Sequence, residues 1–408
     1  MEPDLPEETR EILRGLRAFA HSEVLPRHEK AAAVLDDPQR RYDATGRECE
    51  EVIALRREIR TASARAGYYQ MFVPEDLDGG GQGPVAMYAA WEDLHHLCGG
   101  RHWLGYDSIA HWVTGPSHIL SGVSDAVRAT ILPELLSGEK TSCFAMSEPD
   151  AGSDIWRMST RAVRRDGEWR ITGVKQWITN GAGADYALVF AVTDPALATE
   201  RRGGITAFLL PTISPGFHVD SVLRLYGHPG GREAIISLED VAVPDSHVVG
   251  PMGEGLGVGL SGISLGRLFN AAKSVGLARW ALELAVTYAK DRVTFDRPLI
   301  ENQAISFSLA ESATEILAAH LLGLHCATLL ERGDRAVKEA SMAKAYSTEM
   351  AFKVIDRMMQ VHGGMGLTNE MGLTEAWHEV RTVCIADGSA EMMRRLIAHR
   401  LARGDLDL

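Results

Sequence analysis

Cysteine is scarce and scattered in this chain of 408 residues. Its five cysteines form no CxxC pair, so we expect reduced thiols in a cytoplasmic protein. Positive charge is also in short supply: a net charge of −13 argues against broad nucleic-acid binding. No run of about 18 apolar residues is uninterrupted, which predicts no membrane span. The acidic start MEPDLPEETREILRGL has no apolar core, so we expect no signal peptide there.

Several motifs of nucleotide, metal and acyl chemistry are missing. The sequence contains no GxxxxGK[ST], HExxH or GxSxG, so no motif supports a P-loop protein, a zincin or an α/β-hydrolase. We also expect no metal site. Residues 257–262 do match GxGxxG, but that fingerprint requires a βαβ unit, and here helical patterns follow one another. We interpret this segment as a flexible connection between domains. The adjacent His95 and His96 face different directions on a helix, which favours structural or surface roles.

What is present is a change of hydrophobic period along the chain. Residues 1–140 have charged and apolar residues at helical spacing, and residues 141–250 contain short β-rich runs, including a hairpin signal at Asp166–Gly167. Residues 251–408 return to long amphipathic helices. The sequence therefore predicts an α+β protein with an N-terminal helical domain, a central antiparallel β domain and a C-terminal helical bundle. Two apolar stripes are expected to face the bundle core: Val275, Ala278, Leu282, Ala285, Val286 and Ala289, then Ile305, Leu309, Ile316, Leu317, Leu321 and Leu324.

Four stretches of the sequence are informative when they are considered together and in their order along the chain. They are CFAMSEPDAGSD from Cys143, GVKQWITNGAGADYALV from Gly173, YAKDRVTFDRPL from Tyr288 and QVHGGMGLTNEMGLTEAWHEVR from Gln360. Together they resemble the acyl-CoA dehydrogenase family over nearly the whole chain. The resemblance implies FAD-dependent α,β-dehydrogenation of an acyl-CoA thioester in fatty acid metabolism. It also implies a homodimer or homotetramer that passes electrons to an electron-transferring flavoprotein.

The resemblance also implies where FAD and CoA bind. A flavin ring needs hydrogen-bond partners along its pyrimidine edge and at N5, with an apolar or aromatic wall behind it. Without the family, a core role for Trp177 and a turn role for Ser147 would be favoured. The positions that match flavin-ring contacts are Phe144, Met146, Ser147, Trp177 and Thr179. The positions that match contacts to the nucleotide part of a neighbouring subunit's FAD are Arg292, Thr294, Phe295, Gln360, Gly363 and Gly364. Further cofactor candidates are Ser153, Ser389 and Glu391. Ser153, Arg267 and Gly388 match positions near the CoA substrate.

The stretch IADGSAEMMRR contains the candidate catalytic base. Removal of the weakly acidic α proton requires an accurately placed base, and in the matching phrase the family has a glutamate where this chain has Asp387. Some relatives place the base just before the arginine that matches Arg267, where this chain has Gly266. We therefore expect Asp387 to abstract the proton, although an ordinary Asp-Gly turn is the structural alternative.

Three other functions remain open from the sequence. Flavin-dependent nitroalkane oxidases are relatives that also use an aspartate as the base, so an oxidase without CoA is one alternative. A dehydrogenase acting on a carrier-protein thioester is a second, and a flavin-binding protein without dehydrogenase activity is a third. Residues 148–154 and Arg267 favour CoA.

Overall fold

The computed structural model describes residues 5–226 and 228–407, which form two compact units. The first, here called the bundle unit, comprises Met1–Glu29, Gly83–Tyr106 and Ser264–Leu408. The second, the sheet unit, comprises Lys30–Gln82 and Asp107–Ile263. Each has its own buried core, so each is described by itself.

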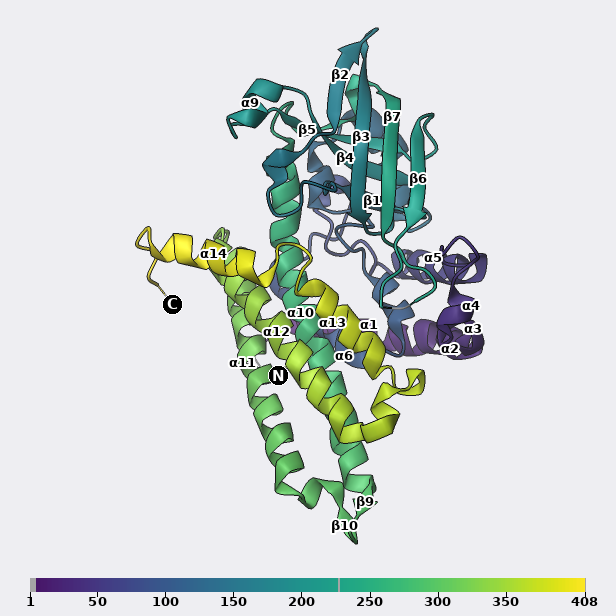
Figure 1. Ribbon diagram of the computed structural model, residues 1–408, viewed down its shortest axis with the longest axis vertical. Helices are drawn as coiled ribbons and strands as arrows, with labels where there is room; N and C mark the ends of the chain where they lie inside the picture. Colours follow the sequence, from purple (N-terminus) through teal and green to yellow (C-terminus); the bar gives the residue numbers. More distant parts are fainter. Residues whose placement is uncertain (1–4, 227, 408) are drawn as a thin grey trace. The chain divides into compact units, whose positions relative to one another are not determined.

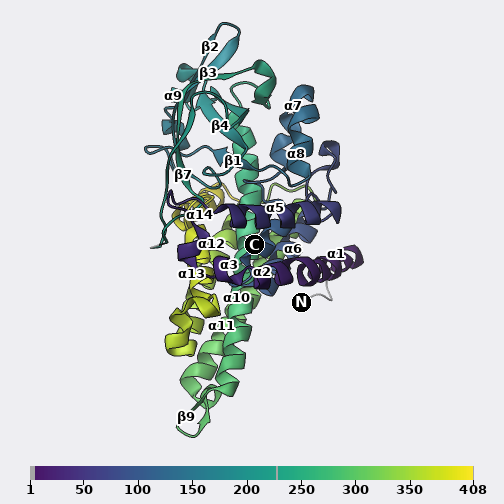
Figure 2. The same cartoon turned by 90° about the vertical axis from the view of Figure 1, so that its right-hand side faces the viewer.

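Three long helices of the bundle unit, α10 (Gly255–Asp291), α11 (Gln303–Glu331) and α12 (Val337–His362), lie side by side in both ribbon views (Figures 1 and 2). A short β9–β10 hairpin joins the ends of the two longest helices, α10 and α11 (Figure 1). Its core is built from small and branched apolar residues, with Ala278, Ala285, Val354 and Ile355 fully buried. The elements are α1 (Glu7–Phe19), α6 (Pro84–Cys98), α10 (Gly255–Asp291), β9 (Val293–Thr294), β10 (Arg297–Pro298), α11 (Gln303–Glu331), α12 (Val337–His362), α13 (Leu373–Val383) and α14 (Ala390–Leu401).

The sheet unit is built on one sheet of eight strands, with the order β6-β7-β3-β2-β4-β5-β8 and β1 paired to β4. Strands β4 and β5 are buried over almost their full length, since apolar clusters cover both faces. The strands are β1 (Ser142–Ala145), β2 (Arg161–Arg165), β3 (Glu168–Ile178), β4 (Tyr186–Val192), β5 (Ile205–Pro211), β6 (Phe217–Val222), β7 (Ala234–Val243) and β8 (Val248–Val249). The remaining α-helices are α2 (Leu25–Lys30), which runs from one unit into the other, then α3 (Ala32–Leu35), α4 (Pro38–Arg41), α5 (Glu50–Arg65), α7 (Asp125–Thr130), α8 (Leu132–Leu136) and α9 (Pro195–Thr199).

The expected order of helices, sheet and helical bundle is confirmed, with two corrections. The sheet is antiparallel except that β1 pairs with β4 in parallel and β2 meets β4 in parallel at one position. The GxGxxG segment is not a flexible connection, because residues 257–262 lie inside α10. Within residues 263–407, which the structure describes, no strand follows it in βαβ fashion, so it is not a dinucleotide fingerprint.

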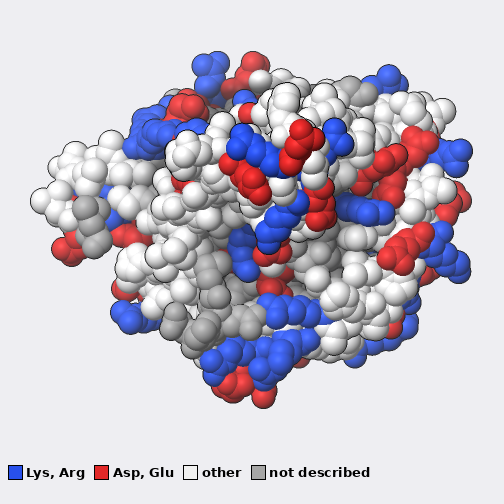
Figure 3. Space-filling view, turned by 90° about the horizontal axis from the view of Figure 1, so that it is seen from below, with Lys and Arg blue, Asp and Glu red and all other residues white. Residues whose placement is uncertain are grey.

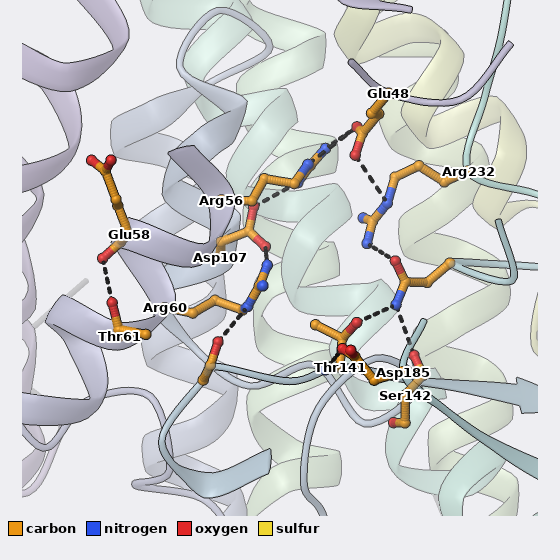
Figure 4. Close-up of polar contacts among 12 residues, drawn as sticks. Glu48, Arg56, Glu58, Arg60, Thr61, Asp107, Thr141, Ser142, Asp185 and Arg232 are labelled. Atoms are coloured by element: carbon orange, nitrogen blue, oxygen red, sulfur yellow. Dashed lines mark hydrogen bonds and ion pairs between the residues drawn. The ribbon is translucent and has the colours of Figure 1, made fainter. Parts of the chain in front are cut away.

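A network of charged and polar side chains attaches α5 to the sheet of the same unit (Figure 4). Arg56 donates to Glu48 Oε1 at 2.8 Å and to Asp107 Oδ2 at 2.5 Å. Arg232 lies 3.9 Å from Glu48 Oε2 and donates to the side-chain oxygen of Asn180 at 3.0 Å. These contacts fix the end of β3, because Asn180 follows this strand by two residues.

Helix α11 is, among the described helices, the one long and apolar enough to cross a membrane by length and composition. Two of its polar side chains have partners inside the bundle unit: His320 Nδ1 lies 2.6 Å from Glu92 Oε2, and Glu315 accepts from Arg357 at 2.7 Å. We therefore interpret α11 as a bundle helix.

Figure 3 shows acidic and basic side chains interspersed over the face in view.

Candidate active site

Asp387 lies in the loop between α13 and α14, and its side chain is half-buried. Its φ is +55° and that of Gly388 is +94°, so two consecutive residues adopt left-handed backbone. Aspartate tolerates this conformation better than most residues, and glycine adopts it without a steric penalty. Ser389 then caps α14 by accepting from the backbone N–H of Met392 at 3.4 Å.

Two side chains from other helices hold this loop. The amide Nδ2 of Asn270, on α10, donates to Asp387 Oδ2 at 2.8 Å. The ammonium of Lys344, on α12, donates to the carbonyl of Gly388 at 2.7 Å. Both residues are buried, so the carboxylate and the backbone that carries it are anchored to the bundle.

Burial and nearby charge act on the Asp387 carboxyl in opposite directions. Burial raises its pKa above the ordinary value, while the Asn270 hydrogen bond and the charges of Lys344, Lys273 and Arg267 lower it. The net shift is upward, which makes this carboxylate a stronger base than an exposed aspartate. Burial also lowers the pKa of Lys344 to about 8, against the attraction of Asp387.

Arg267 and Gly388, the two substrate candidates of the bundle unit, lie beside each other. A side chain at Gly388 would place its Cβ 4.0 Å from a terminal nitrogen of Arg267. Arg267 is more than nine-tenths buried as a residue, and its Nε has no hydrogen-bond partner in the described chain. The structure thus brings together Asp387, Arg267 and Gly388, with Ser389 next in the loop and Glu391 exposed in the first turn of α14.

Asn270 and Lys344 are two residues of this site that the motifs did not reveal. A signal for Asn270 was present in the segment GRLFNAAK, because Arg267 and Asn270 are three residues apart and share a helix face. An amide so placed on an apolar helix indicates a polar partner. Lys344 gives no comparable local signal.

The flavin-ring candidates lie in the sheet unit, and two of their segments are joined there. The backbone N–H of Gln176 donates to the Ser147 carbonyl at 2.9 Å, which brings the end of β1 next to β3. Trp177 has a φ of +62° at an irregularity in the β3–β7 pairing, and its side chain is 56% exposed. Of the other candidates, Met146 is buried, Phe144, Ser147 and Thr179 are partly buried, and Ser153 is exposed.

The nucleotide candidates lie together at one end of the bundle unit. The Tyr288 ring, at the end of α10, lies against that of His362, at the end of α12, with centroids 4.6 Å apart and the ring planes tilted by 31°. Arg292 is exposed one turn beyond Tyr288, and Phe295 is 94% exposed at the tip of the β9–β10 hairpin with a φ of +52°. Thr294 is partly buried, and Gln360, Gly363 and Gly364 are exposed.

These residues fit a flavin nucleotide in two respects. Trp177 and Phe295 each combine an exposed aromatic side chain with an unfavourable backbone conformation. Neither feature stabilises the fold, so the combination indicates a binding role. Gly363 and Gly364 have nothing within 4 Å of the position that a Cβ would occupy, so a ligand can approach this backbone closely.

Comparison with known proteins identifies the family. Models of the acyl-CoA dehydrogenase N-terminal, middle and C-terminal domains match residues 6–139, 143–241 and 253–402. The human mitochondrial short-chain specific acyl-CoA dehydrogenase is 32% identical over 98% of this chain and 91% of its own. A caffeyl-CoA reductase–Etf complex subunit from Acetobacterium woodii is 31% identical over 87% of this chain and 92% of its own. The structure of a Mycobacterium smegmatis glutaryl-CoA dehydrogenase in complex with FADH2 superposes with a TM-score of 0.81, at 25% identity, covering 98% of this chain and 97% of that one.

Fold and sequence thus define a flavoprotein oxidoreductase. The chain belongs to the acyl-CoA dehydrogenase family, whose cofactor is FAD. The resemblance found from the four motifs is therefore confirmed at the level of the family.

Proposed function

We propose that this protein oxidises an acyl-CoA thioester between its α and β carbons, with Asp387 as the base that takes the α proton. The observation that carries the proposal is the half-buried Asp387 carboxylate, held by Asn270 and made more basic by burial. FAD, when bound, supplies the hydride acceptor. Arg267 and Gly388, with Ser153 of the sheet unit, are proposed to orient the CoA thioester.

The proposal for FAD divides its contacts between two sets of residues. The ring is held by Phe144, Met146, Ser147, Trp177 and Thr179, with Ser153, Ser389 and Glu391 as further cofactor contacts. Arg292, Thr294, Phe295, Gln360, Gly363 and Gly364 hold the nucleotide part of the FAD bound by a neighbouring subunit. The exposure of Trp177 and Phe295 supports this division, because each offers an aromatic face that its own unit does not cover.

Arg292→Ala should weaken FAD binding by about 10- to 100-fold, since one hydrogen bond between charged groups is lost. The measurement is the dissociation constant of FAD, from the change in flavin fluorescence on titration of the apoprotein. Arg297→Ala is the matched control, because Arg297 lies on the same hairpin and donates to Asn302 at 2.8 Å. Equal FAD affinity in parent and Arg292→Ala would contradict the anchoring role.

The shared FAD site requires a homodimer or homotetramer, and α11 offers a surface for it. Phe307, Leu317 and Leu321 are 60%, 48% and 55% exposed and recur on one face of this helix. Leu321→Glu should therefore shift the protein toward smaller species in sedimentation velocity, because a charge cannot be buried there without a partner. Leu197→Glu, on α9, substitutes another exposed leucine and should keep the parent's assembly. Unchanged sedimentation of Leu321→Glu would exclude this face.

We further propose that electrons leave the protein to an electron-transferring flavoprotein, as the name of the Acetobacterium woodii relative suggests for that protein. A cytoplasmic location fits the thiols, since all five cysteines are free.

An anaerobic titration of the FAD-loaded protein with a panel of acyl-CoAs tests the reaction. Bleaching of the flavin absorbance by one class of thioester is the expected result. The aspartate base also fits a nitroalkane oxidase, so nitroalkanes belong in the panel, as do acyl carrier-protein thioesters. Bleaching by either of these alone would replace the acyl-CoA proposal, and no bleaching by any of them would leave a flavin-binding protein.

A further inference from the structure

A side-chain amide holds one oxygen of the candidate base. Asn270 is 2% exposed and donates from Nδ2 to Asp387 Oδ2 at 2.8 Å. Within the described part of the chain, this is the one hydrogen bond to that carboxylate. We propose that Asn270 is the positioning residue of the base: it engages Oδ2 and leaves Oδ1 to receive the proton. This inference rests on the function proposed for Asp387.

The need for such a residue follows from the length of the side chain. Asp387 has one methylene fewer than the glutamate of the family phrase, so the carboxylate depends on its backbone and its anchors to reach the reacting carbon. Left-handed backbone at Asp387 and Gly388 sets the direction of the loop, and Lys344 secures it at the Gly388 carbonyl. These contacts hold the backbone but leave the carboxylate free to rotate about its side-chain bonds. The hydrogen bond from Asn270 restricts that rotation.

The hydrogen bond is compatible with both states of the base. In the step, the α proton moves from the substrate carbon to Oδ1, and the electrons of the C–H bond stay on the substrate. Oδ2 becomes the carbonyl oxygen of the carboxylic acid and still accepts from Asn270, so no rearrangement is needed. The bond is stronger to the carboxylate than to the acid, so Asn270 also favours the charged form that begins the reaction.

The nearby cations have other partners. Lys273 pairs with Glu379, and Lys344 donates to the carbonyl of Gly388. Their charges act on Asp387 through space, whereas Asn270 gives a directed contact. The titratable groups near the loop are Arg267 and Lys273 on α10, Lys344 on α12, Glu379 on α13, Cys384 at the end of α13 and Glu391 on α14.

The test is the pH profile of flavin reduction by a thioester that bleaches the parent, measured by anaerobic stopped-flow absorbance. In Asn270→Leu, which is similar in size but has no donor, the apparent pKa of the rising limb should move up by about one unit. The rate at the high-pH plateau should fall by about 10- to 100-fold through loss of orientation. A residue that only supports the fold would lower the rate by one factor at every pH, without moving the limb.

Three variants frame this measurement. Asn270→Gln keeps an amide donor and should recover part of both effects. Ser274→Ala changes a buried residue on the same helix, one turn further on, and should leave both profile and plateau unchanged. If Asn270→Leu does not fold, Asn270→Ala replaces it with the same expectation.

A second readout separates this inference from the proposed reaction. The Asp387 carboxyl can be titrated in the FAD-loaded protein without substrate, by ¹³C NMR of labelled aspartate with Asp387→Asn to assign the signal. Suppose that the pKa of this carboxyl is raised in Asn270→Leu and that no thioester bleaches the parent. The hydrogen bond from Asn270 would then be supported and the proposed reaction rejected. Bleaching of the parent together with identical carboxyl pKa values and reduction profiles in both proteins would reject the positioning role and leave the reaction standing.

Discussion

The Asp387→Asn variant should bind FAD as the parent does and lose flavin reduction by about 10²- to 10⁴-fold, the range that a general base contributes. Asparagine has nearly the same size and still offers an oxygen to the Asn270 donor, so the loop keeps its anchors. Its amide is not basic enough to take the α proton. The measurement is the rate constant of flavin bleaching under anaerobic conditions, with flavin content checked by absorbance.

Two further substitutions make this result specific. Asp334→Asn removes an exposed carboxylate of the same unit and should leave the rate unchanged. Asp387→Glu keeps a base but moves its carboxylate by one methylene away from the Asn270 donor, so we expect a loss on the order of 100-fold. Bleaching of Asp387→Asn at the parent's rate would mean that another group takes the proton.

Local sequence signals were sufficient for much of the fold. The Asp166–Gly167 turn joins β2 and β3 in the expected hairpin register, with Arg165 opposite Glu168. The GxGxxG interpretation failed because glycine has a second use that the pattern does not reveal. A Cβ at Gly259 would lie 2.2 Å from the side chain of Met146, and one at Gly262 would lie 2.3 Å from that of Ile119. These glycines permit close packing of a continuous helix within the sheet unit, so no loop is needed to explain them.

The apolar stripe of α11 shows a different limit of pattern reading. Leu309 and Ile316 are buried as expected, whereas Leu317 and Leu321 are exposed. Helical periodicity places residues three or four positions apart on the same side of a helix. A wide apolar stripe can therefore include two faces of that helix. The core of the bundle uses one of them, and the sequence does not say which.

Asp387 could be proposed from its own phrase, but its surroundings could not. Its hydrogen-bond donor is 117 residues away in the sequence, and Lys344 is 44 residues from the Gly388 carbonyl that it holds. Contacts of this kind depend on which helices pack together and at which height. Periodicity gives each helix its buried face and leaves that pairing undetermined.

Lys175→Met should destabilise the sheet unit by about 3–5 kcal/mol, the cost of leaving one charge of a buried pair without its partner. Lys175 is fully buried and donates to Glu148 Oε1 at 2.8 Å and to the Met146 carbonyl at 3.2 Å. Methionine fills similar space without a charge or a donor. The measurement is the urea concentration at the midpoint of unfolding, for the FAD-free protein so that cofactor binding does not contribute.

The pH dependence of this loss identifies its cause. Burial acts to raise the pKa of Glu148, but the charge and hydrogen bond of Lys175, with donors from Ser159 and Thr160, lower it to about 2. In the parent, this carboxylate therefore stabilises the fold above about pH 4.5, and that contribution is lost as pH falls from 4.5 toward 2. In Lys175→Met the buried Glu148 carboxylate has lost its cation, so its protonation in acid removes the cost of a buried, unpaired charge. The stability difference should be largest near neutral pH and shrink below pH 4.5.

The double variant Lys175→Met/Glu148→Gln completes the design. It removes both charges and keeps one oxygen acceptor. Glu148 now binds the backbone N–H of Ser159 through Oε2 at 2.6 Å and that of Thr160 through Oε1 at 3.0 Å, and a glutamine keeps one of these two bonds. We expect it to be more stable than Lys175→Met at neutral pH, because no unpaired charge remains buried. A stability loss in Lys175→Met that is the same at pH 7 and pH 4, and that the double variant does not reduce, would assign the effect to packing of the Lys175 stem. In that case the ion pair would not be what joins the end of β1 to β3.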